Sequence, residues 1–456
     1  MTSMPLYRPP APVPKSTAGA MAAAFMGQRD MLGLLPEGAY EVFITRAPVG
    51  KRPIFIVNHP GMVRRILQTE VEHYPKSDLM VDALSPLVGD GIFISGGAQW
   101  VKQRQMIDPA FAHMRIKTAF GQMAAATDDA IARFDQIARD DEAMLLDEEM
   151  SYLTADIVFR TIFSRSIDGA DARGIFRAFS DYQNAVPQIN PKTLIGTRAW
   201  EKIDVPSEVR ETCRLIREKL GHMIDRRIAD GHEGNDIAGD LIAARDPDTG
   251  AGFSREDLID QIAVFFLAGH ETTASALTWT FFILSQRPEI MDRMRAEIDR
   301  KIGGEAISFA HTREISCTRN VFREALRLYP PVSFITRIAA EDRQIAAQAI
   351  PKGALMVISP WLIHRHRRFW NTPELFDPDR FSPTREREIM PGSYLPFGLG
   401  PRVCTGASFA ATESALILAA LCRRFEFETL NPRQVEPVGK LTTRPKVPIS
   451  MRLRRR

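Results

Sequence analysis

One long stretch of the chain constrains its fold more than any other. It starts at Ser254, where Asp257 three residues later completes the pattern of a helix N-cap, and its helical pattern extends to about Ser285. At 1.5 Å per residue such a helix is about 50 Å long. Its middle, Ile262–Ala268, is apolar on every side and offers no face to water. The sequence therefore predicts a helix that crosses the interior of the molecule.

The other patterns predict a mainly α protein with a small β region. Two β-rich runs, Tyr40–Thr45 and Pro53–Asn58, are separated by a proline and a glycine and predict a hairpin. Helical patterns dominate the chain between about residues 100 and 425. Within that region we expect one helix to start at Pro288 and another to end at Tyr329, before two prolines. A strand is expected at Ala354–Ile358.

Composition narrows the class of protein. The 456 residues carry a net charge of +3 and are 45% hydrophobic, which is ordinary for a globular protein and does not indicate nucleic acid as the main partner. The four cysteines, Cys213, Cys317, Cys404 and Cys422, include no C-x-x-C pair, so neither structural zinc nor a disulfide framework is expected. No run of about 20 apolar residues predicts a transmembrane segment. We expect a soluble protein of the reducing cytoplasm.

Two parts of the chain differ in composition. Residues 1–36 are rich in proline and alanine and predict a flexible N-terminal arm. Residues 37–456 show no internal repeat and no nucleotide-binding G-x-G-x-x-G motif after a strand, so we expect them to form one domain.

A Gly/Pro-rich loop, Phe397–Gly406, delivers Cys404 to the start of a predicted helix, Ala407–Arg423. A helix N-terminus carries unpaired N–H groups and a positive dipole end, which favour a thiolate. The glycines allow a flat ligand to approach the backbone. An isolated cysteine after a turn would be an ordinary core residue, and the surrounding motif argues against that interpretation.

Polar residues also interrupt the middle of the long apolar helix, at Ala268–Thr273. Burying a carboxylate and hydroxyls there costs free energy, so their presence indicates a function. Gly269 leaves space for a small ligand, and a threonine hydroxyl can bond the preceding turn and open the helix locally. A helix bend with a satisfied polar cluster is the alternative.

Together these segments resemble the cytochrome P450 superfamily. The haem-ligand signature F-x-x-G-x-R-x-C-x-G is met at each fixed position, by Phe397, Gly400, Arg402, Cys404 and Gly406. The resemblance implies that residues 37–456 bind haem b (iron protoporphyrin IX) with Cys404 as the axial ligand of iron. It also implies that Phe397 packs by the sulfur and that Arg402 pairs with a haem propionate. A thiolate ligand favours cleavage of the O–O bond.

The family pattern A/G-G-x-D/E-T-T/S matches the interrupted helix. By resemblance, Glu271 and Thr272 relay protons to the bound oxygen, and Gly269 lies beside it. His270 is variable in the family and receives no role.

A further motif matches on another helix. Glu324, Arg327 and Arg380 correspond to the E-x-x-R helix and the later arginine of the family, which form a buried structural network. Breaking such a network costs about 3–5 kcal/mol because a charge loses its partner.

The resemblance also implies haem propionate contacts from Trp100, Arg104 and Arg337. The spacing of Trp100 and Arg104 would equally be explained by an amphipathic helix. The basic run His364–Arg368 replaces the Asp-Pro common in the family, and we expect a changed loop there.

The resemblance also suggests where the substrate and the redox partner bind. Phe265, Ala268, Val332 and Phe334, with the Leu79–Phe93 loop as a wall, predict a pocket for an apolar substrate. Motif stretches look most like bacterial members that hydroxylate lipids, isoprenoids or carotenoids. Electrons are expected from a ferredoxin or flavodoxin whose reductase uses NAD(P)H. This partner would dock on a basic face formed by Lys102, Arg402, Arg423 and Arg424.

The sequence thus predicts a monooxygenase that inserts one oxygen atom from O2 into an apolar organic molecule. A peroxide-using or isomerising member of the superfamily is one alternative, and a non-catalytic haem sensor is another. The intact Glu271–Thr272 pair favours the monooxygenase, because both alternatives can dispense with a proton relay.

Overall fold

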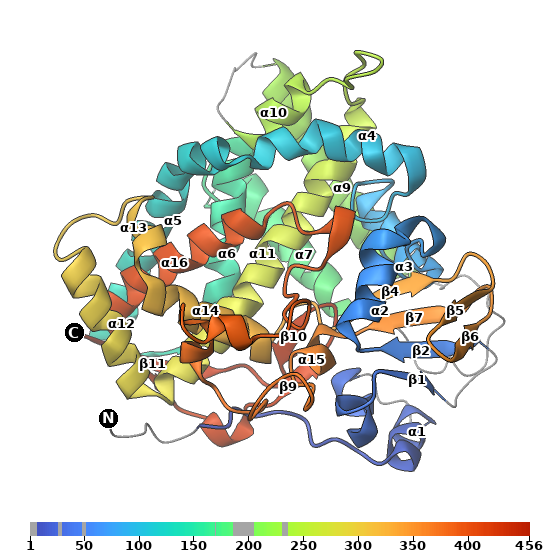
Figure 1. Cartoon of the computed structure of the whole chain (residues 1–456). Coiled ribbons are helices and arrows are strands. Elements are labelled where there is room, and N and C mark those ends of the chain that lie inside the picture. Colours follow the sequence, from blue (N-terminus) through green and yellow to red (C-terminus); the bar gives the residue numbers. More distant parts are fainter. Residues whose placement is uncertain (1–6, 26–29, 48–51, 169, 186–204, 230–235) are drawn as a thin grey trace.

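The long central helix is the main feature of the computed structural model. It is α11 (Arg255–Ser285), and a capping box starts it: Ser254 Oγ accepts the Asp257 N–H, and the Asp257 carboxylate accepts the Ser254 N–H. Almost every residue from Leu258 to Leu284 is buried, and the helix crosses the molecule obliquely (Figure 1). The predicted buried helix is confirmed.

The structure describes residues 7–25, 30–47, 52–168, 170–185, 205–229 and 236–456. Helices form most of this part of the chain (Figure 1). Besides α11 they are α1 (Thr17–Phe25), α2 (Pro60–Arg64), α3 (Asp78–Val88), α4 (Gly97–Ile107), α5 (His113–Arg139), α6 (Leu146–Phe163), α7 (Ala170–Ala185), α9 (Ser207–Ala229), α10 (Ile237–Ala243), α12 (Pro288–Lys301), α13 (His311–Glu314), α14 (Ser316–Leu328), α15 (Pro360–Ile363) and α16 (Ala407–Arg424). The starts of α12 and α16 and the end of α14 lie where the sequence predicted them.

Short strands form the β region. They are β1 (Ile44–Ala47), β2 (Ile54–Val57), β3 (Ala143–Leu145), β4 (Ile335–Ile338), β5 (Arg343–Ile345), β6 (Gln348–Ile350), β7 (Leu355–Ile358), β8 (Phe425–Thr429), β9 (Pro437–Gly439), β10 (Thr443–Pro445) and β11 (Ser450–Arg455). One four-stranded sheet has the order β1-β2-β7-β4, with β2 parallel to β7 and the other pairs antiparallel. Figure 1 shows blue strands from the start of the chain beside orange strands from its last third. The predicted hairpin is confirmed by the pairing of Ile44 with Val57.

Two apolar clusters hold the helices together, and α11 belongs to both. Its first half, Leu258–Leu267, packs with residues of α3, α6, α7 and α9. Its second half, Ala274–Leu284, packs with residues of α5, α14 and α16. The intervening residues Ala268–Thr273 belong to neither cluster. The polar interruption therefore lies where the two halves of the interior meet.

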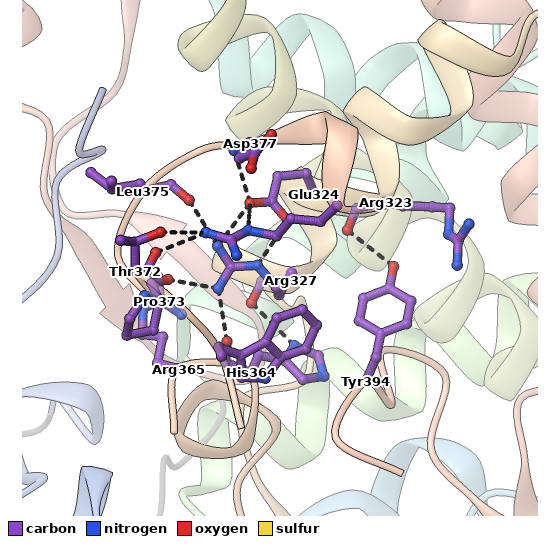
Figure 2. Close-up of polar contacts among 12 residues, drawn as sticks. Arg323, Glu324, Arg327, His364, Arg365, Thr372, Pro373, Leu375, Asp377 and Tyr394 are labelled. Carbon is purple, nitrogen blue, oxygen red and sulfur yellow. Dashed lines mark hydrogen bonds and ion pairs between the residues drawn. The ribbon is translucent and has the colours of Figure 1, made fainter. Parts of the chain in front are cut away.

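The predicted charge network around α14 is confirmed in its geometry (Figure 2). Arg327 binds both carboxylate oxygens of Glu324 at 2.8 Å, and Arg380 Nε lies 3.2 Å from the same carboxylate. The other N–H groups of Arg327 donate to the backbone carbonyls of His364, Pro373 and Leu375. All five guanidinium donors are thus used, and the network ties α14 to the segment that leads toward the cysteine loop.

One local prediction needs correction. The Leu79–Phe93 segment is mostly helix α3, not a loop, because Ser77 caps its N-terminus by accepting the Met80 N–H at 3.2 Å. The basic run His364–Arg368 forms turns after α15, and it begins inside the core, since His364 and Arg365 are buried and Arg365 stacks 3.5 Å above the Trp361 ring.

The described part of residues 1–36 lies against the rest of the molecule. Tyr329 Oη donates to the Pro10 carbonyl, and Leu32 and Leu35 are buried in the larger apolar cluster. The domain boundary at residue 37 remains a prediction. Among the described helices, none combines the length and hydropathy needed to cross a bilayer.

Candidate active site

The cysteine loop has the sharp geometry that its glycines predict. A short turn, Gly400–Arg402, precedes α16, and the Cys404 N–H donates to the Phe397 carbonyl at 3.0 Å. Gly400 has a φ of +78°, and a Cβ there would lie 2.0 Å from the Leu67 carbonyl oxygen. Only glycine fits this position, so the loop is anchored against the backbone of the Arg65–Thr69 turn. Cys404 itself remains exposed.

The electrostatics of Cys404 combine opposing effects. Desolvation of the thiol by the protein around it raises its pKa. The Gly406 backbone N–H and the charge of Arg104 lower it, in the direction expected at the start of α16. A bound metal ion would stabilise the thiolate further, because coordination deprotonates a thiol.

Helix α4 meets the cysteine loop through the motif residues. Arg104 donates from Nη1 to the Val403 carbonyl at 2.9 Å and pairs with Asp108. The Arg402 guanidinium lies 4.5 Å from the Trp100 ring centroid and donates to the Ser95 carbonyl. The structure thus brings together Trp100, Arg104, Arg402 and Cys404, as the sequence predicted.

Three cations gather beside this loop without an acidic partner among the described residues. Lys76 and Arg337 face each other in a backbone bridge, and Arg337 is buried, with its Nη1 bonded to the Thr336 carbonyl. Burial lowers the pKa of Arg337 to about 10, and the charge of Arg402 adds to this effect. Burial also lowers the pKa of Lys76, and the charges of Arg337 and Arg402 lower it further.

Buried cations that repel one another are costly unless an anion joins them. This arrangement fits the two propionates of a haem next to Cys404. Arg337 and Arg402 were predicted for this role, whereas Lys76 was missed. It follows an ordinary Tyr-Pro pair and carries no local signal.

The interrupted segment of α11 opens one face of an otherwise buried helix. Ala268 is exposed, and Gly269 and Thr272 are partly exposed. The Thr272 hydroxyl donates to the Ala268 carbonyl at 2.7 Å, so the expected bond to the preceding turn is confirmed. A Cβ at Gly269 would lie 3.0 Å from the Val158 side chain of α6. Close packing of two helices thus explains this glycine, and its contact with the cofactor remains a prediction.

Glu271 is buried and held by residues that the sequence did not reveal. Its Oε1 accepts hydrogen bonds from Thr442 Oγ1 at 2.7 Å and from Arg444 Nη2 at 2.6 Å. These partners lie on β10 and immediately before it, far along the chain. No local pattern in the sequence could pair residues at such a separation.

A second buried carboxylate, Glu413 on α16, was also missed. Neither of its oxygens has a hydrogen-bond partner within the described part of the chain, and burial raises its pKa to about 8, while Thr273 opposes the shift. Thr273 follows the Glu271–Thr272 pair, so this proton-holding group lies next to the interrupted segment of α11.

The residues predicted to line the substrate pocket lie in different environments. Ala268 and Val332 are exposed, and Phe334 is partly buried. Phe265 is buried and packs edge-to-face on Phe111 at 5.1 Å, which is the behaviour of a core residue. Their contact with a substrate remains a prediction.

A family model for cytochrome P450 matches residues 39–452. The chain belongs to the cytochrome P450 family. Cyclooctatin synthase and cyclooctat-9-en-7-ol 5-monooxygenase, both from Streptomyces melanosporofaciens, are each 31% identical to it. The first alignment covers 85% of this chain and 84% of that protein, and the second covers 83% and 81%. Pentalenene oxygenase from Streptomyces avermitilis is 27% identical, over 88% of this chain and 87% of its own.

Solved structures confirm the fold of this P450. The haem domain of cytochrome P450DA superposes with a TM-score of 0.80 at 23% identity, covering 98% of each chain. The predicted mainly α fold with a small β region is therefore confirmed. Membership of the family makes the protein a haem-thiolate monooxygenase.

The raised pKa of Glu413 predicts how stability changes with pH. The folded protein keeps this proton up to about pH 8, whereas an ordinary glutamate releases it near 4.5. The contribution of the protonated Glu413 to the free energy of unfolding is complete below pH 4.5. It is lost as the pH rises toward 8, at up to about 1.4 kcal/mol per pH unit.

We expect Glu413→Gln, which is neutral at every pH, to remove most of this slope. The thermal unfolding midpoint of the haem-loaded protein between pH 5 and pH 8 measures it. The control is Glu428→Gln, which alters an exposed ion pair with Arg454 and should keep the wild-type slope. An identical slope in Glu413→Gln and wild type would show that Glu413 is ionised in the folded protein.

Proposed function

We propose that this P450 inserts one oxygen atom from O2 into an apolar organic substrate, with Cys404 as the ligand of haem b. In the balanced reaction, substrate R–H, O2, NAD(P)H and a proton yield R–OH, water and NAD(P)+. The observation that carries the proposal is the placement of an exposed cysteine next to three cations that have no acidic partner among the residues the structure describes.

The chain's own residues would hold the cofactor in a defined orientation. Cys404 would supply the axial thiolate, and Phe397 and Gly406 would shape the loop around its sulfur. Trp100, Arg104, Arg337 and Arg402 would bind the propionates, joined by Lys76. When bound, the haem supplies activation of dioxygen, which a thiolate ligand promotes.

Glu271 and Thr272 would move protons on the other side of the cofactor. Thr272 lies on the partly exposed face of α11, and its hydroxyl is oriented by the Ala268 carbonyl. Glu271 is the adjacent carboxylate, and such a group can exchange protons with water and with a neighbouring hydroxyl. Gly269 would leave room beside them.

The substrate is proposed to be an isoprenoid hydrocarbon or a related lipid. The predicted contacts Phe265, Ala268, Val332 and Phe334 carry no charge, so an apolar molecule would be held by shape. Two relatives are named for the cyclooctatin series and one for pentalenene, and all three resemble this chain over most of its length. A panel of sesquiterpene and diterpene hydrocarbons, scored by the shift of the haem spectrum on binding, tests this class.

Electrons are proposed to come from a separate ferredoxin or flavodoxin and its NAD(P)H-dependent reductase, in the cytoplasm. Arg402 is directed toward Trp100, so it contributes less to an outer face than the sequence predicted. Lys102 pairs with Asp246 at 3.1 Å, Arg423 donates to two backbone carbonyls, and Arg424 is exposed. We retain these three as the basic face for an acidic partner.

The haem-thiolate proposal predicts a spectrum. The reduced protein exposed to carbon monoxide should show a strongly red-shifted Soret band, and Cys404→Ala should lose it because no other thiol is in place. Cys317→Ala, which alters a partly buried cysteine elsewhere, should keep the band. A histidine-type band in the wild-type protein would contradict the proposal.

The proton relay predicts uncoupling. In Thr272→Ala, NAD(P)H and O2 consumption should persist, while product per NAD(P)H falls at least about tenfold and peroxide replaces it. Thr280→Ala is the matched control, because Thr280 makes the same bond to the carbonyl four residues earlier but lies in the apolar half of α11. Unchanged coupling in Thr272→Ala would overturn the role of Thr272 in the relay, whereas a wild-type protein without NAD(P)H-dependent product would favour a sensor or a peroxide-using enzyme.

The docking face predicts weaker electron delivery when its charge is removed. In Lys102→Gln/Arg424→Gln, the KM for a plant-type ferredoxin should rise several-fold at low salt, and the difference from wild type should shrink as salt screens the contact. Arg214→Gln, an exposed arginine on α9, should not change it. If the double variant takes electrons as well as wild type does, the partner docks elsewhere.

A further inference from the structure

Arg444 forms the ion pair that holds the acid of the proposed proton relay. Its Nε and Nη2 atoms lie 2.9 Å and 2.6 Å from Glu271 Oε1, and Thr442 Oγ1 donates to the same oxygen. Glu271 is 4% exposed and Arg444 is 26% exposed at the side chain. The carboxylate is therefore fixed from one side by two neighbouring residues of the C-terminal segment.

The backbone that carries Arg444 is itself firmly attached to the core. The Thr443 carbonyl accepts Ser275 Oγ at 2.6 Å and Trp279 Nε1 at 2.9 Å, both from α11. The Thr443 hydroxyl donates to the Pro330 carbonyl, and its N–H donates to the Pro331 carbonyl. Arg444 thus follows a residue that is bonded to α11 on one side and to the segment after α14 on the other.

A second contact links Arg444 to α7. Its Nη2 donates to Gln183 Oε1 at 2.7 Å, and the Gln183 amide nitrogen lies 3.3 Å from His270 Nε2. His270 Nδ1 faces the Phe266 carbonyl at 2.7 Å, which makes Nδ1 the protonated nitrogen and leaves Nε2 to accept from Gln183. Burial lowers the pKa of His270, which agrees with a neutral ring. Every member of the chain Arg444–Gln183–His270–Phe266 then has one consistent donor direction.

From these contacts we propose that Arg444 is a positioning residue, which fixes the Glu271 carboxylate for proton delivery. Through Arg444, the position of this carboxylate depends on the contact between Gln183 and α11. This inference rests on the proposed role of Glu271. An arginine suits the task because its planar fork can bind a carboxylate and an amide at once and does not lose its charge. Lysine keeps the charge but cannot span both partners with a fixed geometry.

The position of Gln183 gives the arrangement a consequence for catalysis. Gln183 is buried near the end of α7, and α7 packs with the first half of α11 in one apolar cluster. A shift of α7 would remove one anchor of Arg444 and loosen the Glu271 carboxylate. Proton delivery would then be efficient only when α7 lies against α11.

The test is a double-mutant cycle of Arg444→Gln and Glu271→Gln in the haem-loaded protein. The readout is peroxide released per NADH oxidised, with a sesquiterpene hydrocarbon as probe and a ferredoxin as electron donor. Arg444→Gln should raise this ratio about three- to tenfold while the Kd of the probe changes less than about twofold. In the Glu271→Gln background, Arg444→Gln should cause no further change.

Further variants complete the experiment. Arg444→Lys should restore part of the coupling, and Gln183→Ala should raise peroxide release less than Arg444→Gln does. These two variants carry the test if Arg444→Gln fails to fold. Lys446→Gln, which breaks an exposed ion pair with Glu436 two residues beyond Arg444, is the matched control and should behave as wild type.

The outcomes separate the two hypotheses. Additive effects of Arg444→Gln and Glu271→Gln, or wild-type coupling in all Arg444 variants, would overturn the positioning role. Wild-type coupling in Glu271→Gln alone would instead overturn the proposed relay, whatever the Arg444 variants do.

Discussion

The architecture depends on how α11 is buried. Its two halves pack into different apolar clusters, so the helix joins both parts of the core, as its neighbour α6 also does. A helix buried on all sides normally excludes polar groups, because an unpaired one costs several kcal/mol. Between the clusters, at Ala268–Thr273, the helix carries the buried pair His270 and Glu271 beside the partly exposed Thr272. The same gap that permits a carboxylate and a threonine there also leaves Ala268 exposed to a ligand.

Two groups of buried or partly buried cations illustrate the difference between structural and ligand-binding charge. In the α14 network (Figure 2), Arg327 is balanced by Glu324 and satisfied by surrounding carbonyls, so it needs nothing further. Beside the cysteine loop, Arg337 and Arg402 share a site with Lys76 and no acid pairs with them in the described chain. Positive charges that no acidic side chain neutralises can bind an anionic group. This contrast, more than the number of basic residues, supports the placement of the haem propionates.

Titratable groups surround the interrupted segment from several elements. Glu271 is positioned by Arg444, Glu413 lies on α16, and His270 is contacted by Gln183. Each depends on a residue far away in sequence, and together they connect α7, α11, α16 and the β9–β10 hairpin. The proposed proton chemistry is thus a property of the assembled core and not of the α11 motif alone.

The sequence by itself determined the elements and the motif positions. A long apolar stretch and a local N-cap specify α11, prolines end α14, and glycines with forced backbone conformations specify the loop at Cys404. All of these signals act over a few residues. A local signal misled at the Leu79–Phe93 segment, which is mostly helix.

Only the tertiary structure decided which distant groups meet. Desolvation at Cys404, the gathering of Lys76 with Arg337, and the pairing of Glu271 with Arg444 depend on packing between elements, and the last two contacts join residues that are far apart in the sequence. Electrostatic free energies vary with burial and distance, and neither quantity is encoded in local patterns. The sequence therefore identifies the chemistry, while the fold sets the charges and positions with which it operates.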